Sequence, residues 1–142
     1  MHCQPAPPSP ADRRLLIAED DPDTLFPLRE FFCDQGFTVD CVVGPTEARR
    51  MLERFPYSVL LTDLHLTENR QSEGLIVVEQ ARRHQPDIRA IMMTAFPSLQ
   101  MEFDALRLGA DLVVSKPIAL VALNNAVNGE RPKTSGSECR TS

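Results

Sequence analysis

The stretch that most constrains the fold runs from Tyr57 to Leu66 and reads Y-S-V-L-L-T-D-L-H-L. Its front half, residues 58–62, is a nearly continuous run of apolar and β-favouring residues, which is typical of a strand buried on both faces of a parallel sheet. Asp63 follows where the apolar run stops. Open α/β sheets bind ligands at the carboxyl ends of their strands, so Asp63 is a candidate site residue. The alternative is that its carboxylate only caps the strand or the next turn.

Length and composition predict one ordinary globular domain. The chain has 142 residues, of which 42% are hydrophobic and 25% charged, with a net charge of -5. It has no basic patch or Lys/Arg run that would neutralise a phosphate backbone, so we expect no direct binding to nucleic acid. No apolar run approaches the roughly 20 residues that cross a bilayer, and the N-terminus lacks the apolar core of a signal peptide. We therefore expect a cytoplasmic protein without membrane contact.

The four cysteines give no sign of a metal site. They form no C-x-x-C pair and have no metal-ligand spacing. We expect reduced thiols, with Cys33 and Cys41 in buried elements and Cys3 and Cys139 in tails.

Hydrophobic periodicity divides the rest of the chain into a tail, a domain and a second tail. Residues 1–12 form a flexible proline-rich tail, residues 13–128 the folded domain, and residues 129–142 a polar tail or the start of a linker. The pattern predicts strands at 14–18, 37–43, 58–62, 88–94 and 112–115. Helices are predicted at 22–35, 46–55, 74–84, within 95–109 and at 120–128, with a mobile loop at 67–73.

Two local features of these helices are informative. Asp21 is placed to cap the first helix, and Gly36 and Gly109 are natural stops for the first and fourth. Pro27 lies beyond the first turn of its helix, so we expect it to kink the helix or delay its start. In the fourth helix, Leu99, Phe103 and Leu106 recur at helical spacing.

Five strands alternating with five helices predict a doubly wound parallel sheet. Right-handed crossovers place the carboxyl ends of all its strands at one edge. Polar side chains follow four of these strands, and they should converge there: Glu19, Asp20, Asp63, Thr94 and Lys116. Each alone has an ordinary explanation, as a helix cap, a strand-end hydroxyl or a surface lysine. Together they indicate one site.

Three carboxylates that face one another repel unless a cation joins them, and Mg²⁺ is the hard ion that prefers such oxygen ligands. A lysine and a hydroxyl beside them suit a phosphoryl group, because Lys116 can pair with its oxygens and Thr94 can donate a hydrogen bond. Asp63 would then be the nucleophile and form an aspartyl phosphate.

The chain resembles the receiver domain of bacterial two-component response regulators, across nearly everything between Leu15 and Val127. The motifs that carry the resemblance are L-L-I-A-E-D-D-P-D, V-L-L-T-D-L-H-L, I-M-M-T-A and G-A-D-L-V-V-S-K-P, in this order. The resemblance implies a flavodoxin-like sheet with strand order 2-1-3-4-5. It also implies a signalling switch, not an enzyme acting on an external substrate.

The resemblance assigns a role to each candidate in the acidic group. Asp63 would accept a phosphoryl group from a histidine kinase or phosphotransfer protein. Glu19 and Asp20 would hold Mg²⁺, with Asp63 and the backbone carbonyl of His65 completing the protein ligands.

It also assigns roles around the phosphoryl group. Thr94 would bind the phosphoryl oxygens in the active state, and Lys116 would pair with them. The bond between Lys116 and Pro117 would be cis, as in the family, and would aim the lysine into the site.

This sequence departs from the family at positions that matter for signalling. The family usually has an aromatic residue three positions before the lysine, where this chain has Val113, and valine cannot make the aromatic's rotamer switch. The loop after Asp63 has Thr67 in place of the usual proline. Phe96 and His65 occupy positions that in the family tune attack of water on the phosphoaspartate, and we expect the bulky Phe96 to shield it.

The resemblance implies what kind of partner this chain has, but it names no individual partner. In the family, the face made by the fourth helix, fifth strand and fifth helix commonly carries dimer or effector contacts, here residues 99–108 and 120–127.

One alternative function is a pseudo-receiver, an interaction module not controlled by phosphorylation. A flavin or nucleotide carrier would want glycines after the first strand, where this chain has acids. An aspartyl phosphatase would want a second acid where this chain has His65.

Overall fold

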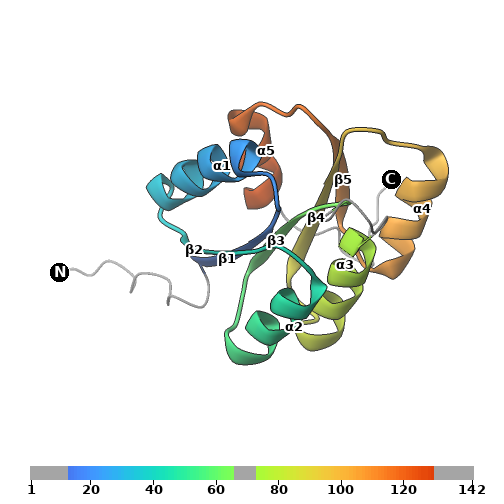
Figure 1. Ribbon diagram of the computed structural model, residues 1–142, viewed down its shortest axis with the longest axis horizontal. Helices are drawn as coiled ribbons and strands as arrows, with labels where there is room; N and C mark the ends of the chain where they lie inside the picture. Colours follow the sequence, from blue (N-terminus) through green and yellow to red (C-terminus); the bar gives the residue numbers. More distant parts are fainter. Residues whose placement is uncertain (1–12, 66–72, 130–142) are drawn as a thin grey trace.

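The computed structural model describes residues 13–65 and 73–129 (Figure 1). Its strands are β1 (Arg14–Ala18), β2 (Thr38–Val42), β3 (Val59–Asp63), β4 (Arg89–Thr94) and β5 (Leu112–Ser115). Its helices are α1 (Pro22–Asp34), α2 (Pro45–Arg54), α3 (Glu73–His84), α4 (Leu99–Leu108) and α5 (Leu120–Asn128). Strands and helices alternate along the chain as predicted, and their bounds differ from the predicted ones by a few residues at most.

The strands form one parallel sheet in the order β2-β1-β3-β4-β5. The predicted flavodoxin-like order is therefore confirmed. β3 lies in the middle, and its residues 59–62 are all buried, as expected for an apolar strand covered on both faces. β2 lies at one edge, which suits the half-buried Asp40 in its middle.

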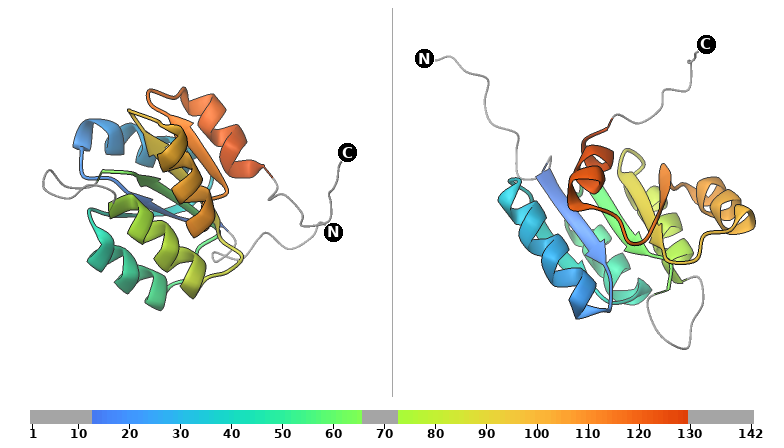
Figure 2. Two further views of the ribbon diagram at one scale, coloured as in Figure 1. Left: turned by 90° about the vertical axis from the view of Figure 1, so that its right-hand side faces the viewer. Right: turned by 90° about the horizontal axis from the view of Figure 1, so that it is seen from above.

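Helices cover both faces of the sheet, so the domain has three layers. Successive residues of a strand point to opposite faces, and this alternation divides the core into two clusters. Leu15, Ile17 and Leu61 pack with α1 and α5, around Phe32 and Leu123. The other face, with Leu16, Leu60 and Met92, packs against α2, α3 and α4. Figures 1 and 2 show α1 and α5 on one side of the sheet and α2 and α3 on the other.

The ends of α1 follow the predicted chemistry, but its interior does not. The Asp21 side chain accepts a hydrogen bond from the Asp23 amide and caps the helix. Gly36, just beyond the helix, has φ of 98°, a conformation that favours glycine. Of the two effects expected of Pro27, a late start is wrong, because α1 begins at Pro22 and continues through Pro27; a kink stays a prediction. Tertiary packing of Leu28 and Phe32 outweighs the one missing backbone donor.

The structure shows which side of α4 is buried, which its helical spacing alone does not say. Leu99, Phe103 and Leu106 are 87%, 63% and 46% exposed, whereas Ala105 on the opposite side of the helix is buried. The periodicity correctly predicted a helix, whose inner side carries Ala105 and the partly buried Met101, while Leu99, Phe103 and Leu106 face outward. The apolar side chains of this outward side, Leu99, Phe103 and Leu106, are called the α4 stripe below.

The expected burial of two cysteines is also wrong. Cys33 and Cys41 are both exposed free thiols. Cys41 lies on the edge strand β2, which lacks a neighbouring strand on its outer side, and Cys33 lies in the last turn of α1 next to the buried Phe32. An apolar sequence environment did not guarantee burial, because edge positions keep one side open.

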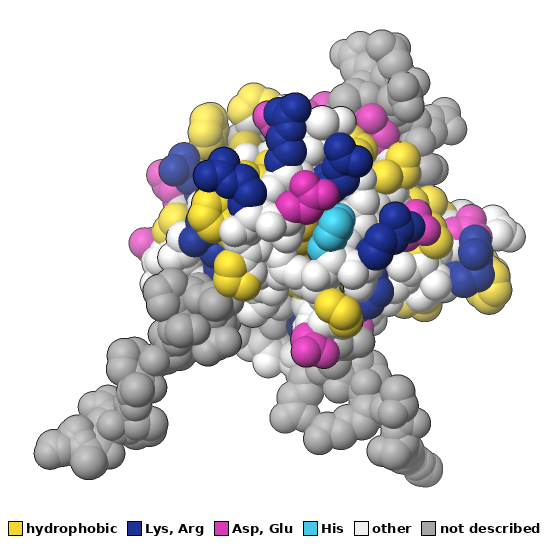
Figure 3. Space-filling model, turned by 90° about the horizontal axis from the view of Figure 1, so that it is seen from below, with side chains coloured by type: hydrophobic (Ala, Val, Ile, Leu, Met, Phe, Trp, Pro, Cys, Tyr) yellow, Lys and Arg dark blue, Asp and Glu magenta, His cyan; other side chains and the backbone are white. Residues whose placement is uncertain are grey.

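Arginines gather on the surface of α2 and α3 although the sequence has no basic run (Figure 3). Acidic side chains interrupt this cluster: Arg49 lies 3.9 Å from Glu53, and Arg83 lies 3.5 Å from Glu79. Exposed pairs of this kind contribute little to stability, but they divide the positive charge.

Several predictions lie outside the described residues. They are the tails at 1–12 and 130–142 and most of the loop after Asp63, including Thr67. The last residue of that predicted loop, Glu73, is the first residue of α3. Among the helices that the structure describes, none combines the length and the apolar character needed to cross a membrane.

Candidate functional site

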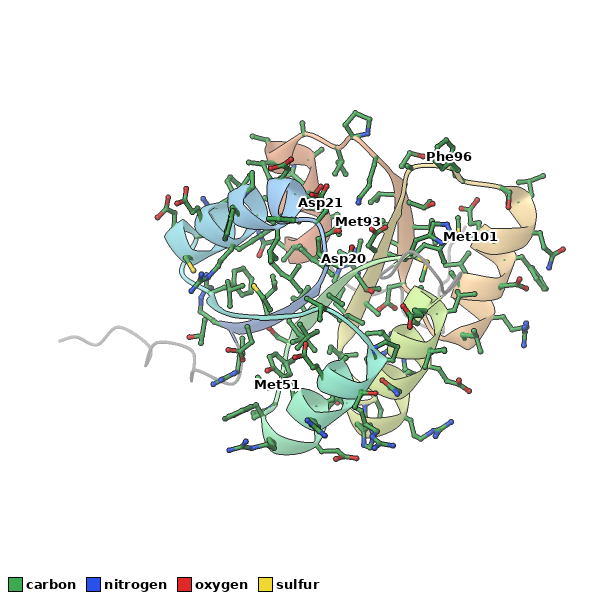
Figure 4. The ribbon with its side chains drawn as sticks, in the orientation of Figure 1. Asp20, Asp21, Met51, Met93, Phe96 and Met101 are labelled. Atoms are coloured by element: carbon green, nitrogen blue, oxygen red, sulfur yellow. The ribbon has the colours of Figure 1, made fainter. Side chains whose placement is uncertain are left out.

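Three carboxylates meet at the carboxyl edge of the sheet. β1 and β3 are paired with Ala18 beside Thr62, so the next residues, Glu19 and Asp63, emerge level with each other. Asp20 follows, and Figure 4 shows it where the chain passes from β1 to α1. Carboxylate oxygens of Glu19, Asp20 and Asp63 all lie within 4.8 Å of one another. The parallel pairing of β1 with β3 therefore brings the three carboxylates together into a compact acidic group at the ends of these two strands.

Lys116 reaches this acidic group from the end of β5. β4 and β5 are paired with Thr94 beside Ser115, and the Lys116 amide donates to the Thr94 carbonyl at 2.7 Å. Lys116 Nζ lies 3.1 Å from Glu19 Oε1 and 3.2 Å from Asp63 Oδ2. The Lys116–Pro117 peptide bond is cis. One ammonium group thus contacts two of the three carboxylates.

Burial and charge set the protonation behaviour of this site. Glu19 is fully buried, and burial together with the charge of Asp63 raises the pKa of its carboxyl, against the opposing effect of Lys116. Burial also raises the pKa of Asp20. Burial lowers the pKa of Lys116, but the carboxylates of Glu19 and Asp63 outweigh it, so the pKa is raised overall. The site therefore holds a firmly charged lysine among carboxylates that repel one another.

The donor set fits a hard divalent cation. The potential ligand atoms are carboxylate oxygens, which Mg²⁺ prefers, and the three carboxylates are close enough to bind one ion together. Glu19 is further oriented by the Asp21 amide, which donates to its Oε2 at 3.2 Å. A cation would relieve the repulsion from Asp63, which adds to burial in raising the pKa of Glu19. His65 lies two residues beyond Asp63 and is exposed.

Thr94 ends β4 and is fully buried. Its hydroxyl oxygen accepts a hydrogen bond from the Phe96 amide at 3.2 Å. Phe96 itself is 82% exposed, and Figure 4 places its ring on the loop leading to α4, apart from Asp20 and Asp21. Shielding of Asp63 by this ring stays a prediction, and it requires the loop to fold inward.

Val113 lies half-buried on β5 and packs against the core on the α2, α3 and α4 face. A valine held there has no outward rotamer that could replace an aromatic switch.

Sequence reasoning gave little weight to one residue at this edge. Gly74, where the sequence predicts only the start of a helix, is the second residue of α3, and its amide donates to the Leu64 carbonyl at 2.8 Å. The available signal was a glycine at the start of a helix, where no turn explains it.

An open groove of about 450 Å³ lies beside Lys116. α1 forms one wall, and the segment after β5 forms the other. Its lining residues are mostly apolar and include Pro27, Leu28, Met93, Pro117, Ile118 and Leu120. The groove thus borders Lys116, whereas Glu19, Asp20 and Asp63 are not among its lining residues.

Comparison with known proteins identifies the family. Residues 15–128 match the response regulator receiver domain. The chain belongs to this family. Among relatives of this receiver domain, the photosynthetic apparatus regulatory protein RegA of Cereibacter sphaeroides is 30% identical over 107 residues, covering 75% of this chain and 56% of RegA. Regulatory protein AtoC of Escherichia coli is 30% identical over 114 residues, covering 80% of this chain and 24% of AtoC. The chain spans about half or less of the length of the relatives it matches first.

Solved structures agree on the fold of the receiver domain. A CheY-like receiver domain protein from Methanospirillum hungatei has a TM-score of 0.75 at 26% identity, covering 81% of this chain and 90% of that one. A response regulator from Burkholderia pseudomallei has a TM-score of 0.75 at 23% identity, covering 82% and 67% respectively. That structure carries a phosphorylated aspartic acid and a calcium ion. The chain is thus a receiver domain of the kind found in bacterial two-component systems.

Proposed function

We propose that this receiver domain is a phosphorylation-controlled switch in the cytoplasm, in which Asp63 accepts a phosphoryl group from a histidine kinase or a phosphotransfer protein. The observation that carries the proposal is the position of Asp63, within 4.8 Å of two further carboxylates and 3.2 Å from a lysine. A carboxylate that only capped a strand would need neither the two further carboxylates nor the lysine beside it. We place the folded receiver at residues 13–128, flanked by a proline-rich tail and a polar tail or linker. The domain would catalyse only its own phosphorylation and dephosphorylation.

The proposed transfer needs little covalent chemistry from the protein. An oxygen of the Asp63 carboxylate attacks the phosphorus of a phosphohistidine; a P–O bond forms, the P–N bond breaks, and the imidazole leaves with the electron pair. Lys116, already 3.2 Å from Asp63 Oδ2, would pair with a phosphoryl oxygen. Thr94 would donate its hydroxyl hydrogen to another.

Mg²⁺ is the proposed cofactor, held by the carboxylates of Glu19, Asp20 and Asp63 and the backbone carbonyl of His65. When bound, the ion would neutralise negative charge that gathers on the phosphoryl oxygens. The support is the donor chemistry: Glu19 is fully buried beside a second carboxylate, an arrangement that a divalent cation stabilises.

Phosphorylation can control a partner only if the change at Asp63 is transmitted to a partner-binding surface. Val113 cannot transmit it as an aromatic side chain at this position would. We propose that the link between the site and this surface is the hydrogen bond from the Phe96 amide to the Thr94 hydroxyl oxygen, because Phe96 lies in the short segment that joins β4 to α4, three residues before Leu99. A Thr94 side chain that turns toward a phosphoryl group would weaken this bond and free the loop. The partner surface would be the face of α4, β5 and α5, where the α4 stripe and Val121 are exposed.

The first experiment is incubation with Mg²⁺ and acetyl phosphate, followed by intact mass measurement, on the wild type and on Asp63→Asn. The expected result is one phosphoryl adduct that requires Mg²⁺ and is absent from the variant. No adduct on a folded wild-type protein, with the donor in excess, would favour the pseudo-receiver alternative.

The partner surface needs its own test, by sedimentation with and without beryllofluoride as a phosphoryl mimic. If α4 carries the contact, Phe103→Ser should reduce any association that the mimic induces, while Ile76→Ser on α3 should not. Both side chains are exposed, so neither change should cost much stability. Equal effects of the two variants would place the contact elsewhere.

A further inference from the structure

The start of α3 packs directly on the backbone that carries Asp63. A Cβ atom built at Gly74 would overlap the Asp63 carbonyl oxygen, and it would lie 2.8 Å from Leu64 Cα and 3.0 Å from the Asp63 carbonyl carbon. Cβ contacts under about 3 Å are not tolerated in packed proteins, and here every neighbour is backbone, which cannot rotate away. Only glycine allows α3 to approach this closely.

Hydrogen bonds hold the same segment from two sides. The Gly74 amide donates to the Leu64 carbonyl at 2.8 Å, and the Leu64 amide donates to the Met93 carbonyl at 3.0 Å. The Asp63–Leu64 segment is therefore held between β4 and the first turn of α3. Leu64 separates Asp63 from His65, so one short backbone stretch carries the nucleophile and the proposed carbonyl ligand.

We propose that Gly74 is a positioning residue for the phosphoacceptor: its missing side chain lets α3 fix the Asp63–Leu64 backbone, and thereby the carboxylate and carbonyl that face the cation. This inference rests on the proposed function of Asp63. It predicts that adding one methyl group at residue 74 impairs the site more than it impairs the fold. Loss of the close approach would push Asp63 away from the acidic group, or push α3 off β3.

The test compares Gly74→Ala with two controls. Gly44→Ala adds the same methyl group at a position with no atom within 4 Å of the new Cβ and with extended backbone. Leu52→Ala removes a buried side chain from α2 and so lowers stability through the core. All variants are measured at a temperature at which circular dichroism finds them folded.

Three readouts separate positioning from stability: the Mg²⁺ concentration giving half-maximal binding by calorimetry, the rate of phosphorylation by acetyl phosphate, and backbone amide shifts without ligand. We expect Gly74→Ala to raise the half-saturating Mg²⁺ concentration and to lower the rate, each by about tenfold, and to shift the amides of Asp63, Leu64 and Met93. The two controls should remain within about twofold. A folded Gly74→Ala with wild-type Mg²⁺ binding and unshifted amides would overturn the inference.

Two further outcomes are decisive. If the wild type takes no phosphoryl group, the proposed function fails, while the amide shifts still decide whether residue 74 positions Asp63. If Gly74→Ala does not fold, the wild type supplies the test: binding of Mg²⁺ or beryllofluoride should shift the Gly74 amide, which bonds to this backbone, and leave that of Gly44 in place. An unmoved Gly74 amide would overturn the proposal.

Discussion

Lys116 Nζ lies 3.2 Å from Asp63 Oδ2, although the two residues end different strands, β5 and β3, that β4 separates in the sheet. The same Nζ is 3.1 Å from the fully buried Glu19. Without a metal ion, this one ammonium group is the cation that the described structure places against the acidic group. It therefore competes for the oxygens that Mg²⁺ would use.

Replacement of Lys116 should consequently have opposite effects on stability and metal binding. Lys116→Ala leaves Glu19 buried beside Asp63 without a cation, and in EDTA we expect the free energy of unfolding to fall by about 1–3 kcal/mol. The same variant should bind Mg²⁺ several-fold more tightly. Urea unfolding in EDTA and calorimetric Mg²⁺ titration measure the two effects. Lys116→Arg keeps the charge and is the control; weaker Mg²⁺ binding by Lys116→Ala would contradict the competition.

Removal of one acidic charge should stabilise the metal-free protein. Desolvation and the nearby carboxylates raise the pKa of Asp20, so its ionised form costs stability at neutral pH. In EDTA at neutral pH, Asp20→Asn should raise the melting temperature by about 2–4 °C, and the stabilisation by Mg²⁺ should largely disappear. Asp87→Asn, an exposed change before β4, should alter neither. Equal melting temperatures of Asp20→Asn and the wild type in EDTA would argue against repulsion in the site.

Tyr57 offers a titration that reports on one residue, because the chain has one tyrosine and no tryptophan. Burial and a 2.6 Å hydrogen bond from its hydroxyl to Asp40 raise the pKa of Tyr57. The ultraviolet absorbance of the folded protein should therefore titrate well above pH 10, and should return to about 10 in urea. The raised pKa contributes stability that is complete below pH 10 and is lost as the pH rises further. A folded-state midpoint at 10 would rule out this hydrogen bond in solution.

Two adjacent arginines on α3 should differ sharply in their effect on stability. Arg82 joins α3 to the segment between α4 and β5: its guanidinium lies 2.8 Å from Asp111 and donates to the Gly109 and Ile88 carbonyls at 2.6 and 2.7 Å. Arg82→Ala should cost about 3 kcal/mol, since it breaks a largely buried pair. Arg83 is 70% exposed and 3.5 Å from Glu79, so Arg83→Ala should change stability by less than about 0.5 kcal/mol. Urea unfolding of both variants tests the contrast.

Most of the architecture could be predicted because it depends on local patterns. The apolar run before Asp63 predicts a buried strand, and alternation of strands and helices predicts a parallel sheet. Parallel strands then bring their carboxyl ends together whatever the side chains do. For this reason the meeting of Glu19, Asp20, Asp63 and Lys116 at one edge could be anticipated, and the register of Ala18 with Thr62 now explains it.

The orientation of α4 could not be predicted in the same way. Helical spacing of Leu99, Phe103 and Leu106 is compatible with an inward or an outward face. The choice depends on how α4 packs between α3 and β5. There Ala105 is fully buried and Met101 packs partly buried against the core, while Leu99, Phe103 and Leu106 stay in solvent. The exposure of Cys41 could have been anticipated, because the predicted strand order already places β2 at the edge of the sheet.

The sequence by itself determined the elements, their order and the polar residues at the strand ends, because these follow from short-range periodicity and chain direction. Only the tertiary structure decided which atoms touch. Lys116 meets Glu19 across 97 residues of chain, and Gly74 meets the backbone of Asp63 through a close approach that no local pattern encodes. Such contacts depend on distances of a few tenths of an ångström between packed elements, and these are settled only when the whole core is packed.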